Sequence, residues 1–120
     1  MAAKDDLGRA GEERAAQHLS ATGHTILDRN WRCPQGEIDI VAERGRDLVV
    51  VEVKTRRSDL FGHPAEAVDA KKAERLWRLA MAWIVVHPRA ARGRRLRIDV
   101  IAITGPDPTS ARLEHLEDAL

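Results

Sequence analysis

Residues 37–54 read EIDIVAERGRDLVVVEVK, and this stretch decides the fold. Polar and apolar residues alternate over Glu37–Glu43, which predicts a strand. The valine-rich run Leu48–Lys54 predicts a second strand. Between them, the two-residue loop Gly45-Arg46 has glycine first and predicts a type II′ turn. The stretch is therefore a predicted β-hairpin.

The turn fixes which residues oppose each other, with Arg44 opposite Asp47. One face of the hairpin then consists of three opposed apolar pairs, namely Ile38 with Val53, Ile40 with Val51, and Ala42 with Val49. We expect this face to pack on a helix. The opposite face carries two charged pairs, Asp39 with Glu52 and Glu37 with Lys54.

The charged face has two interpretations. Opposed residues have Cβ atoms roughly 4.5–5.5 Å apart, so Asp39 and Glu52 repel unless a cation lies between them or one holds a proton. Carboxylates are the ligands that Mg²⁺ takes, and Lys54 on the same face could orient or deprotonate an attacking water. The alternative is a solvent-facing polar hairpin with a plain ion pair between Glu37 and Lys54.

A further carboxylate comes from the first predicted helix, which we expect to be capped by Asp5 or Asp6 and to end near Ala21. Glu12 shares a helix face with the small and apolar residues Gly8, Ala15, Ala16 and Leu19, whereas Glu13 shares its side with Arg9, Gln17 and Ser20. Glu12 therefore points toward the sheet. A metal site is one partner for it, and an ion pair with Arg9 or exposure to solvent is the other reading.

Outside the hairpin the chain alternates strands and helices. We expect a strand at 25–32 before the turn Cys33-Pro34-Gln35-Gly36. A helix should begin at Pro64 and end near His87, where Pro88 terminates it. The remaining predicted strands are 96–104 and 112–117. The order α-β-β-β-α-β-β predicts an α/β fold in which a mixed sheet is flanked by helices.

The composition narrows the class of protein. The 120 residues fit one domain, 1–120. The single Cys33 provides neither a disulfide nor a thiolate zinc site, and with no leader or membrane-length apolar run we expect a cytoplasmic protein without a membrane partner. The net charge of +1 favours no partner by itself. The arginine-rich segment 89–97 could neutralise phosphates, but a solvated loop is the favoured reading.

Several motifs together resemble the YraN family of bacterial proteins. They are Gly8-Arg9-Ala10-Gly11-Glu12, Asn30-Trp31-Arg32-Cys33, Gly36-Glu37-Ile38-Asp39, Val51-Glu52-Val53-Lys54-Thr55-Arg56 and Gly62-His63-Pro64-Ala65-Glu66-Ala67-Val68. They span nearly the whole chain in the order of that family. The family is uncharacterised, and it is similar to restriction-endonuclease-like PD-(D/E)xK nucleases and to archaeal Holliday-junction resolvases.

The resemblance implies a restriction-endonuclease-like αβββαβ core and Mg²⁺-dependent hydrolysis of DNA, with Mn²⁺ as an alternative metal. It assigns Asp39 and Glu52 as the acidic pair and Lys54 as the lysine of the motif. Glu12 corresponds to the helix carboxylate, and the Val53 carbonyl to a further metal ligand. One departure is Ile38, which stands where the name of the motif has proline.

Basic residues near this site are candidates for contacts with nucleic acid. Arg56 and Arg57 follow the hairpin, and Lys71, Lys72 and Arg75 lie on the next helix. They could follow a phosphate backbone, although a solvated helix face is the other reading, and Lys72 could also assist the metal site. Trp31, Trp77 and Trp83 are expected to serve packing.

The leading hypothesis is a metal-dependent endonuclease that hydrolyses DNA phosphodiester bonds, with branched or structured DNA as the substrate. The alternative is a nucleic-acid-binding or adaptor domain that keeps the nuclease fold without turnover. Related nucleases often act as dimers, so a homodimer is compatible with either hypothesis, but the sequence shows no interface.

Overall fold

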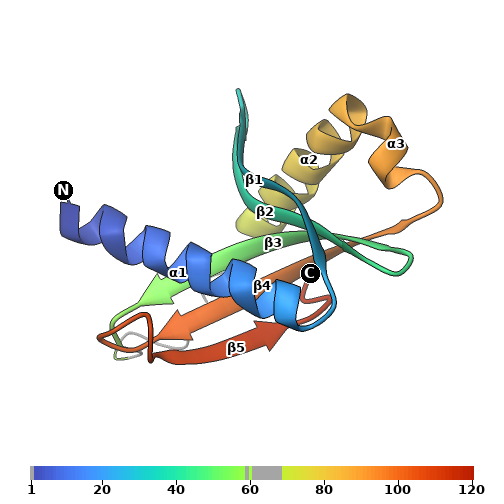
Figure 1. Ribbon diagram of the computed structural model, residues 1–120. Coiled ribbons are helices and arrows are strands. Elements are labelled where there is room, and N and C mark those ends of the chain that lie inside the picture. Colours follow the sequence, from blue (N-terminus) through green and yellow to red (C-terminus); the bar gives the residue numbers. More distant parts are fainter. Residues whose placement is uncertain (1, 59, 61–68) are drawn as a thin grey trace.

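A mixed five-stranded sheet lies between two long helices (Figure 1). The computed structural model describes residues 2–58, 60 and 69–120. The elements along the chain are α1 (Ala2–Ala21), β1 (Thr25–Cys33), β2 (Gly36–Arg44), β3 (Asp47–Arg56), α2 (Ala70–Val86), α3 (Pro88–Ala91), β4 (Arg95–Thr104) and β5 (Arg112–Leu116).

The strands follow the order β1-β2-β3-β4-β5 across the sheet. Neighbours are antiparallel except β3 and β4, which are parallel because α2 and α3 connect them on one side of the sheet. This confirms the expected α/β fold and its αβββαβ core, to which α3 and β5 are added. β3 and β4 are central and covered on both faces, which accounts for their continuous valine and isoleucine content.

Each face of the sheet has its own hydrophobic core. On the α1 side, the buried residues Ala15, Ala16 and Leu19 pack against β2, β3 and β4. On the α2 side, the corresponding cluster joins α2 to the opposite faces of the same strands through Leu76, Leu79, Ala80 and Trp83. Successive residues of β3 therefore alternate between the two cores, which fixes β3 as the central strand of the fold.

The predicted hairpin turn is confirmed. Gly45 has a φ of 58°, Arg46 does not have a positive φ, and Arg44 pairs with Asp47, as a type II′ loop requires. Two helix starts were predicted wrongly. α1 begins at Ala2, so Asp5 and Asp6 lie inside the helix and do not cap it.

The start of α2 is the second correction. Asp69 has an extended backbone and its carboxylate accepts a hydrogen bond from the Lys72 N–H, so it is the N-cap. The predicted start at Pro64 lies outside the described residues, and within them α2 begins at Ala70, after Asp69. Pro88 follows the end of α2 as expected and also begins the short α3. None of the described helices has the length and apolarity needed to cross a membrane.

Candidate active site

The candidate site lies where β2 separates from β3. The paired residues of the two strands run from Arg44–Asp47 to Ile40–Val51 and end there. The next β3 N–H on that side belongs to Val53, and it donates to the Asp39 carboxylate over 2.8 Å. A side-chain oxygen thus replaces a backbone carbonyl in the ladder, and the Asp39 carboxylate is held against β3.

Beyond this point β2 follows β1. Ile38 pairs with Trp31 and packs in the α2-side core, and Glu37 forms an ion pair with Arg32 over 3.1 Å. The predicted pairs Asp39–Glu52, Ile38–Val53 and Glu37–Lys54 are therefore not part of the β2–β3 ladder, because β1 and β2 twist toward α2. In Figure 1 this β1–β2 arm, residues 31–38, rises out of the sheet beside α2.

On β3, Glu52 and Lys54 form an ion pair over 3.1 Å, with only 18% and 19% of their side chains exposed. Burial opposes the charge of Lys54, but its hydrogen bond with Lys72 and the nearby Glu52 carboxylate outweigh burial and raise its pKa. The hydrogen bond to Lys54, together with burial, lowers the pKa of Lys72. Of the two lysines, Lys54 is therefore the one whose charged form is favoured.

The Asp39 carboxyl lies in a strongly negative environment. Burial is the largest cause that raises its pKa to about 7, and the charges of Glu52, Glu12 and Glu37 raise it further, while the Val53 N–H acts in the opposite direction. The charge of Glu52 therefore acts on Asp39, although the two residues are not paired in the β2–β3 ladder. A carboxyl crowded by other carboxylates favours either a proton or a bound cation.

α1 brings Glu12 to the same region, since its neighbours Ala15, Ala16 and Leu19 are buried against the sheet as predicted. Burial and the charge of Glu37 raise the pKa of Glu12, whereas a hydrogen bond from Asn30 lowers it. Among the described residues, the set of three possible ligands whose atoms lie within 4.8 Å of one another is elsewhere, at His24, Asp99 and Glu117. Glu12, Asp39 and Glu52 do not form such a set, and Glu12 affects the pKa of Asp39 less than Glu52 does.

Gly11 permits α1 to approach β3 closely enough to deliver Glu12. A Cβ at Gly11 would lie 2.0 Å from Thr55 Oγ1 and 2.9 Å from Thr55 Cβ. Gly11→Ala is therefore expected to lower the free energy of unfolding by about 1–3 kcal/mol. Urea denaturation measures the change.

Gly8→Ala is the matched control on the same helix, since a Cβ there meets no atom within 4 Å. It is expected to raise the free energy of unfolding by about 0.5–1 kcal/mol, the ordinary gain of alanine over glycine in a helix. Equal stabilisation by both changes would contradict the proposed contact between α1 and Thr55.

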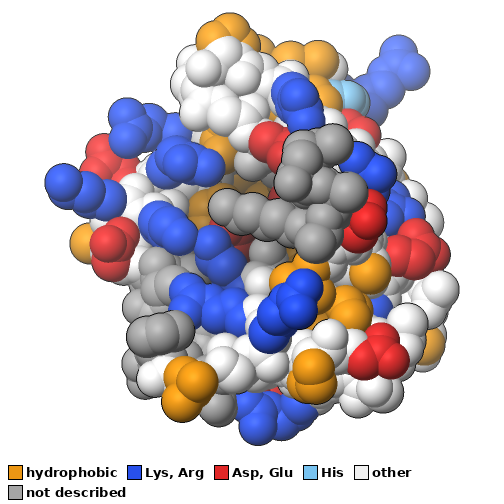
Figure 2. Space-filling view, turned by 90° about the vertical axis from the view of Figure 1, so that its left-hand side faces the viewer, with side chains coloured by type: hydrophobic (Ala, Val, Ile, Leu, Met, Phe, Trp, Pro, Cys, Tyr) orange, Lys and Arg blue, Asp and Glu red, His pale blue; other side chains and the backbone are white. Residues whose placement is uncertain are grey.

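The basic candidates differ in how close they come to the site. Lys72 contacts Lys54, and Arg75 extends toward Gly36 at the tip of the arm. Arg56 and Arg57 lie at the carboxyl end of β3, and Lys71 is exposed on α2. Figure 2 faces the end of the molecule where α1 begins and β3 ends, and it shows Lys and Arg side chains gathered around a hollow.

Next to the site, a groove of about 350 Å³ is lined by Leu7, Gly8, Glu12, Val53, Lys54 and Thr55. Two of the carried-over site residues on β3 and one on α1 therefore open onto the same space. Asn30 was not predicted as a site residue. Its φ of 53°, a conformation that asparagine tolerates better than most residues, lets it reach Glu12.

The tryptophans serve packing, as expected. Trp83 is buried and donates a hydrogen bond to Asp28 over 3.0 Å, while Trp31 and Trp77 pack against the α2-side core. His87 stacks on Trp83 with ring centroids 4.1 Å apart. β1 is thus held to α2 by apolar contacts in the arm and by one indole hydrogen bond to Asp28 before it.

Comparisons with family models and with individual proteins identify the same family. The model of "Uncharacterised protein family UPF0102" matches residues 11–103. A UPF0102 protein of Frankia alni is 51% identical over 119 residues, covering 99% of this chain and 98% of that protein. One from Paenarthrobacter aurescens is 54% identical over 116 residues, covering 97% and 94%.

Among solved structures, a complex of EndoMS with double-stranded DNA aligns with a TM-score of 0.36 and 14% identity. The alignment covers 74% of this chain and 35% of that one, so no activity follows from it. The family match covers most of the chain, and the relatives match over nearly their whole length. The chain belongs to the UPF0102 family.

Proposed function

We propose that this protein is a Mg²⁺-dependent endonuclease that hydrolyses phosphodiester bonds in DNA. The observation that carries the proposal is the convergence of Asp39 with the Glu52–Lys54 ion pair where β2 leaves β3. This combination places two carboxylates and one ammonium group next to a groove that opens to the surface.

The residues present fit Mg²⁺. Their donor atoms are carboxylate oxygens, which this hard cation prefers, and Mg²⁺ sites commonly use one or two carboxylates. Burial and the neighbouring carboxylates raise the pKa of Asp39 to about 7, and a bound cation would offset both effects. Asp39 and Glu52 would hold the ion, with Glu12 extending the negative charge around it.

Val53 supports this arrangement through its backbone. Its N–H points toward β2 and holds Asp39. In an antiparallel ladder the carbonyl of the same residue points to the same side. Since β2 has separated from β3 here, the Val53 carbonyl faces the gap, where it is available as a further oxygen ligand.

The protein's own side chains divide the remaining chemistry. When bound, Mg²⁺ would polarise the phosphate and lower the pKa of a water ligand. Lys54 holds its proton against Glu52 and presents positive charge to a phosphoryl oxygen as negative charge develops there. Lys72 contacts Lys54 and adds positive charge at the same place, which would support binding of the phosphate.

DNA is the proposed substrate because positively charged side chains surround the site (Figure 2). Arg56, Arg57, Lys71, Lys72 and Arg75 would contact backbone phosphates. The resemblance to resolvase-like nucleases supports branched or structured DNA as the substrate class.

The test is an assay of end-labelled branched, flapped and linear DNA with Mg²⁺, with Mn²⁺, and with EDTA. We expect cleavage only with the metals, and faster cleavage of the branched substrates. DNA binding without cleavage on every substrate and with either metal would contradict the enzyme and favour an adaptor with the nuclease fold. The absence of both binding and cleavage would contradict a role with DNA.

A further inference from the structure

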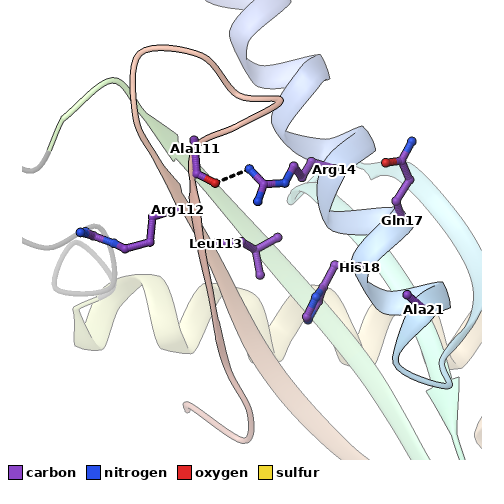
Figure 3. Close-up of a pocket in the computed structure, with 7 residues that line it drawn as sticks. All are labelled: Arg14, Gln17, His18, Ala21, Ala111, Arg112 and Leu113. Carbon is purple, nitrogen blue, oxygen red and sulfur yellow. Dashed lines mark hydrogen bonds between the residues drawn. The ribbon is translucent and has the colours of Figure 1, made fainter.

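A second groove, separate from the carboxylate site, lies between α1 and β5. Its volume is about 520 Å³, and its lining residues are Arg14, Gln17, His18, Ala21, Ala111, Arg112 and Leu113. Figure 3 shows Arg14 and His18 on the side of α1 that faces β5, while Leu113 points toward the helix and the Arg112 side chain points away. None of the lining residues is acidic.

His18 is the outer end of a buried hydrogen-bonded chain. Its Nε2 lies 3.1 Å from His115 Nδ1, and His115 Nε2 lies 2.7 Å from Asp99 Oδ2. Burial alone would raise the pKa of Asp99, but hydrogen bonds from His115, Arg97 and the Asp118 N–H lower it. Asp99 is therefore a carboxylate, which only accepts hydrogen bonds.

The chain fixes which nitrogen of His18 is available to a ligand. Because Asp99 only accepts, His115 donates to it from Nε2. Whichever of the two histidines carries the hydrogen between them, Nε2 of His18 is engaged by His115. The remaining Nδ1 of His18 is left for the groove. A proton taken up at this nitrogen can be balanced through His115 by the Asp99 charge.

Arg14 supplies a second cationic group one helical turn away. Its Nη1 donates to the carbonyls of Pro108 and Ala111, which directs the guanidinium across the groove toward the turn before β5 (Figure 3). The guanidinium has five N–H donors, and these two bonds use only Nη1. Among the described residues, the charged or titratable groups around His18 are Arg14 on α1, Arg112 and His115 on β5, Asp99 behind it on β4, and Glu117.

We propose that this groove binds a phosphate group, held by the Arg14 guanidinium and the His18 imidazole. Burial lowers the pKa of His18, and the positive charges of His115 and Arg14 lower it further. A bound anion in the groove would instead raise the pKa of His18. A phosphate monoester suits the pair best, since it carries nearly two negative charges at neutral pH and offers several acceptor oxygens.

The first experiment follows the histidine rings by NMR while inorganic phosphate is added. We expect the His18 resonances to shift saturably and the pKa of His18 to rise. His18→Gln should weaken phosphate binding about tenfold, the effect of one lost charge-assisted hydrogen bond. Arg14→Gln should weaken it by a similar factor. Thermal unfolding of Arg14→Gln shows whether the turn before β5 is still held.

Arg9→Gln is the control, because Arg9 is an exposed arginine of the same helix outside the groove. It should leave phosphate binding unchanged. A second arm compares 5′-phosphorylated and unphosphorylated oligonucleotides, which separates a nucleic-acid end from free phosphate or a small phosphate ester. Phosphate shifts of equal size across all surface cations, unchanged in His18→Gln, would overturn the proposal. Loss of DNA cleavage would leave this proposal unaffected, since Glu12, Asp39, Glu52 and Lys54 are not part of the groove.

Discussion

The Asp39→Asn variant is expected to lose Mg²⁺-dependent DNA cleavage by about a thousandfold or more, since a metal contributes several kcal/mol to transition-state stabilisation. Asparagine retains an oxygen that can accept the Val53 N–H, so the β2–β3 contact should persist. The change therefore removes the charge with little alteration of the backbone. Cleavage rates and Mg²⁺ titrations measure the loss.

The same variant should change the pH dependence of stability. The pKa of Asp39 is about 7 in the folded protein, above its ordinary value of 3.8. A raised pKa means that the fold favours the protonated form. The stabilisation is complete below about pH 4 and is lost as pH rises through 7. Without metal, the wild type should therefore lose stability relative to Asp39→Asn between pH 4 and 8.

With Mg²⁺ present, the stability of the wild type should gain more from the metal as the pH rises. Its binding requires a deprotonated Asp39, so Mg²⁺ affinity and the rise in Tm on adding Mg²⁺ should both increase from pH 6 to pH 8. Asp39→Asn should show neither. Glu13→Gln is the control, because Glu13 is an exposed carboxylate on α1 that pairs with Arg29. Cleavage by Asp39→Asn at the wild-type rate would rule out the proposed site.

Replacing Arg97 with methionine is expected to lower the free energy of unfolding by about 3–5 kcal/mol. Only 8% of the Arg97 side chain is exposed, and it contacts Asp47 over 2.7 Å, Asp99 over 2.9 Å and Glu117 over 3.2 Å. Asp99 is fully buried, so the variant leaves a buried carboxylate without its main countercharge. Urea denaturation at pH 7 measures the loss.

Arg95→Met provides the comparison. Arg95 is 62% exposed and pairs with Asp118 over 2.7 Å, so its replacement should cost less than about 1 kcal/mol. Adding Asp99→Asn to Arg97→Met should recover part of the stability, since it removes the unpaired charge. Equal losses in the two single variants would show that the Arg97 cluster contributes no more than a surface ion pair.

The ion pairs of Arg97 also account for a group of residues whose spacing resembles that of metal ligands. Ligand atoms of His24, Asp99 and Glu117 lie within 4.8 Å of one another, a spacing that an ion could bridge. The Arg97 guanidinium already contacts all three residues, with 3.4 Å to His24 Nε2. We therefore interpret the grouping as a structural ion-pair cluster.

The sequence predicted the hairpin well because a two-residue turn fixes register locally. The pairs from Arg44–Asp47 to Ile40–Val51 are confirmed. The prediction fails beyond Ile40, from the Asp39–Glu52 pair onward, because the arm follows α2 whereas register rules assume that both strands continue side by side. The contact between Trp83 and Asp28 joins residues 55 positions apart in the chain, and no local sequence pattern predicts it.

The arginine-rich segment shows a similar limit. Its composition favoured a solvated loop, yet Arg97 is buried and Arg94 forms an ion pair with Glu43. Arg89 and Arg92 are exposed as expected. The partners of the buried arginine come from β3, β4 and the C-terminal segment, and only the folded sheet brings them together.

All three tryptophans belong to the α2 side of the sheet. Intrinsic fluorescence will therefore report unfolding of the α2 side of the sheet and will be nearly insensitive to unfolding of α1. Circular dichroism detects both long helices and therefore also reports unfolding of α1. A midpoint by circular dichroism at lower denaturant than the midpoint by fluorescence would show that α1, the helix carrying Glu12, unfolds before the α2 side.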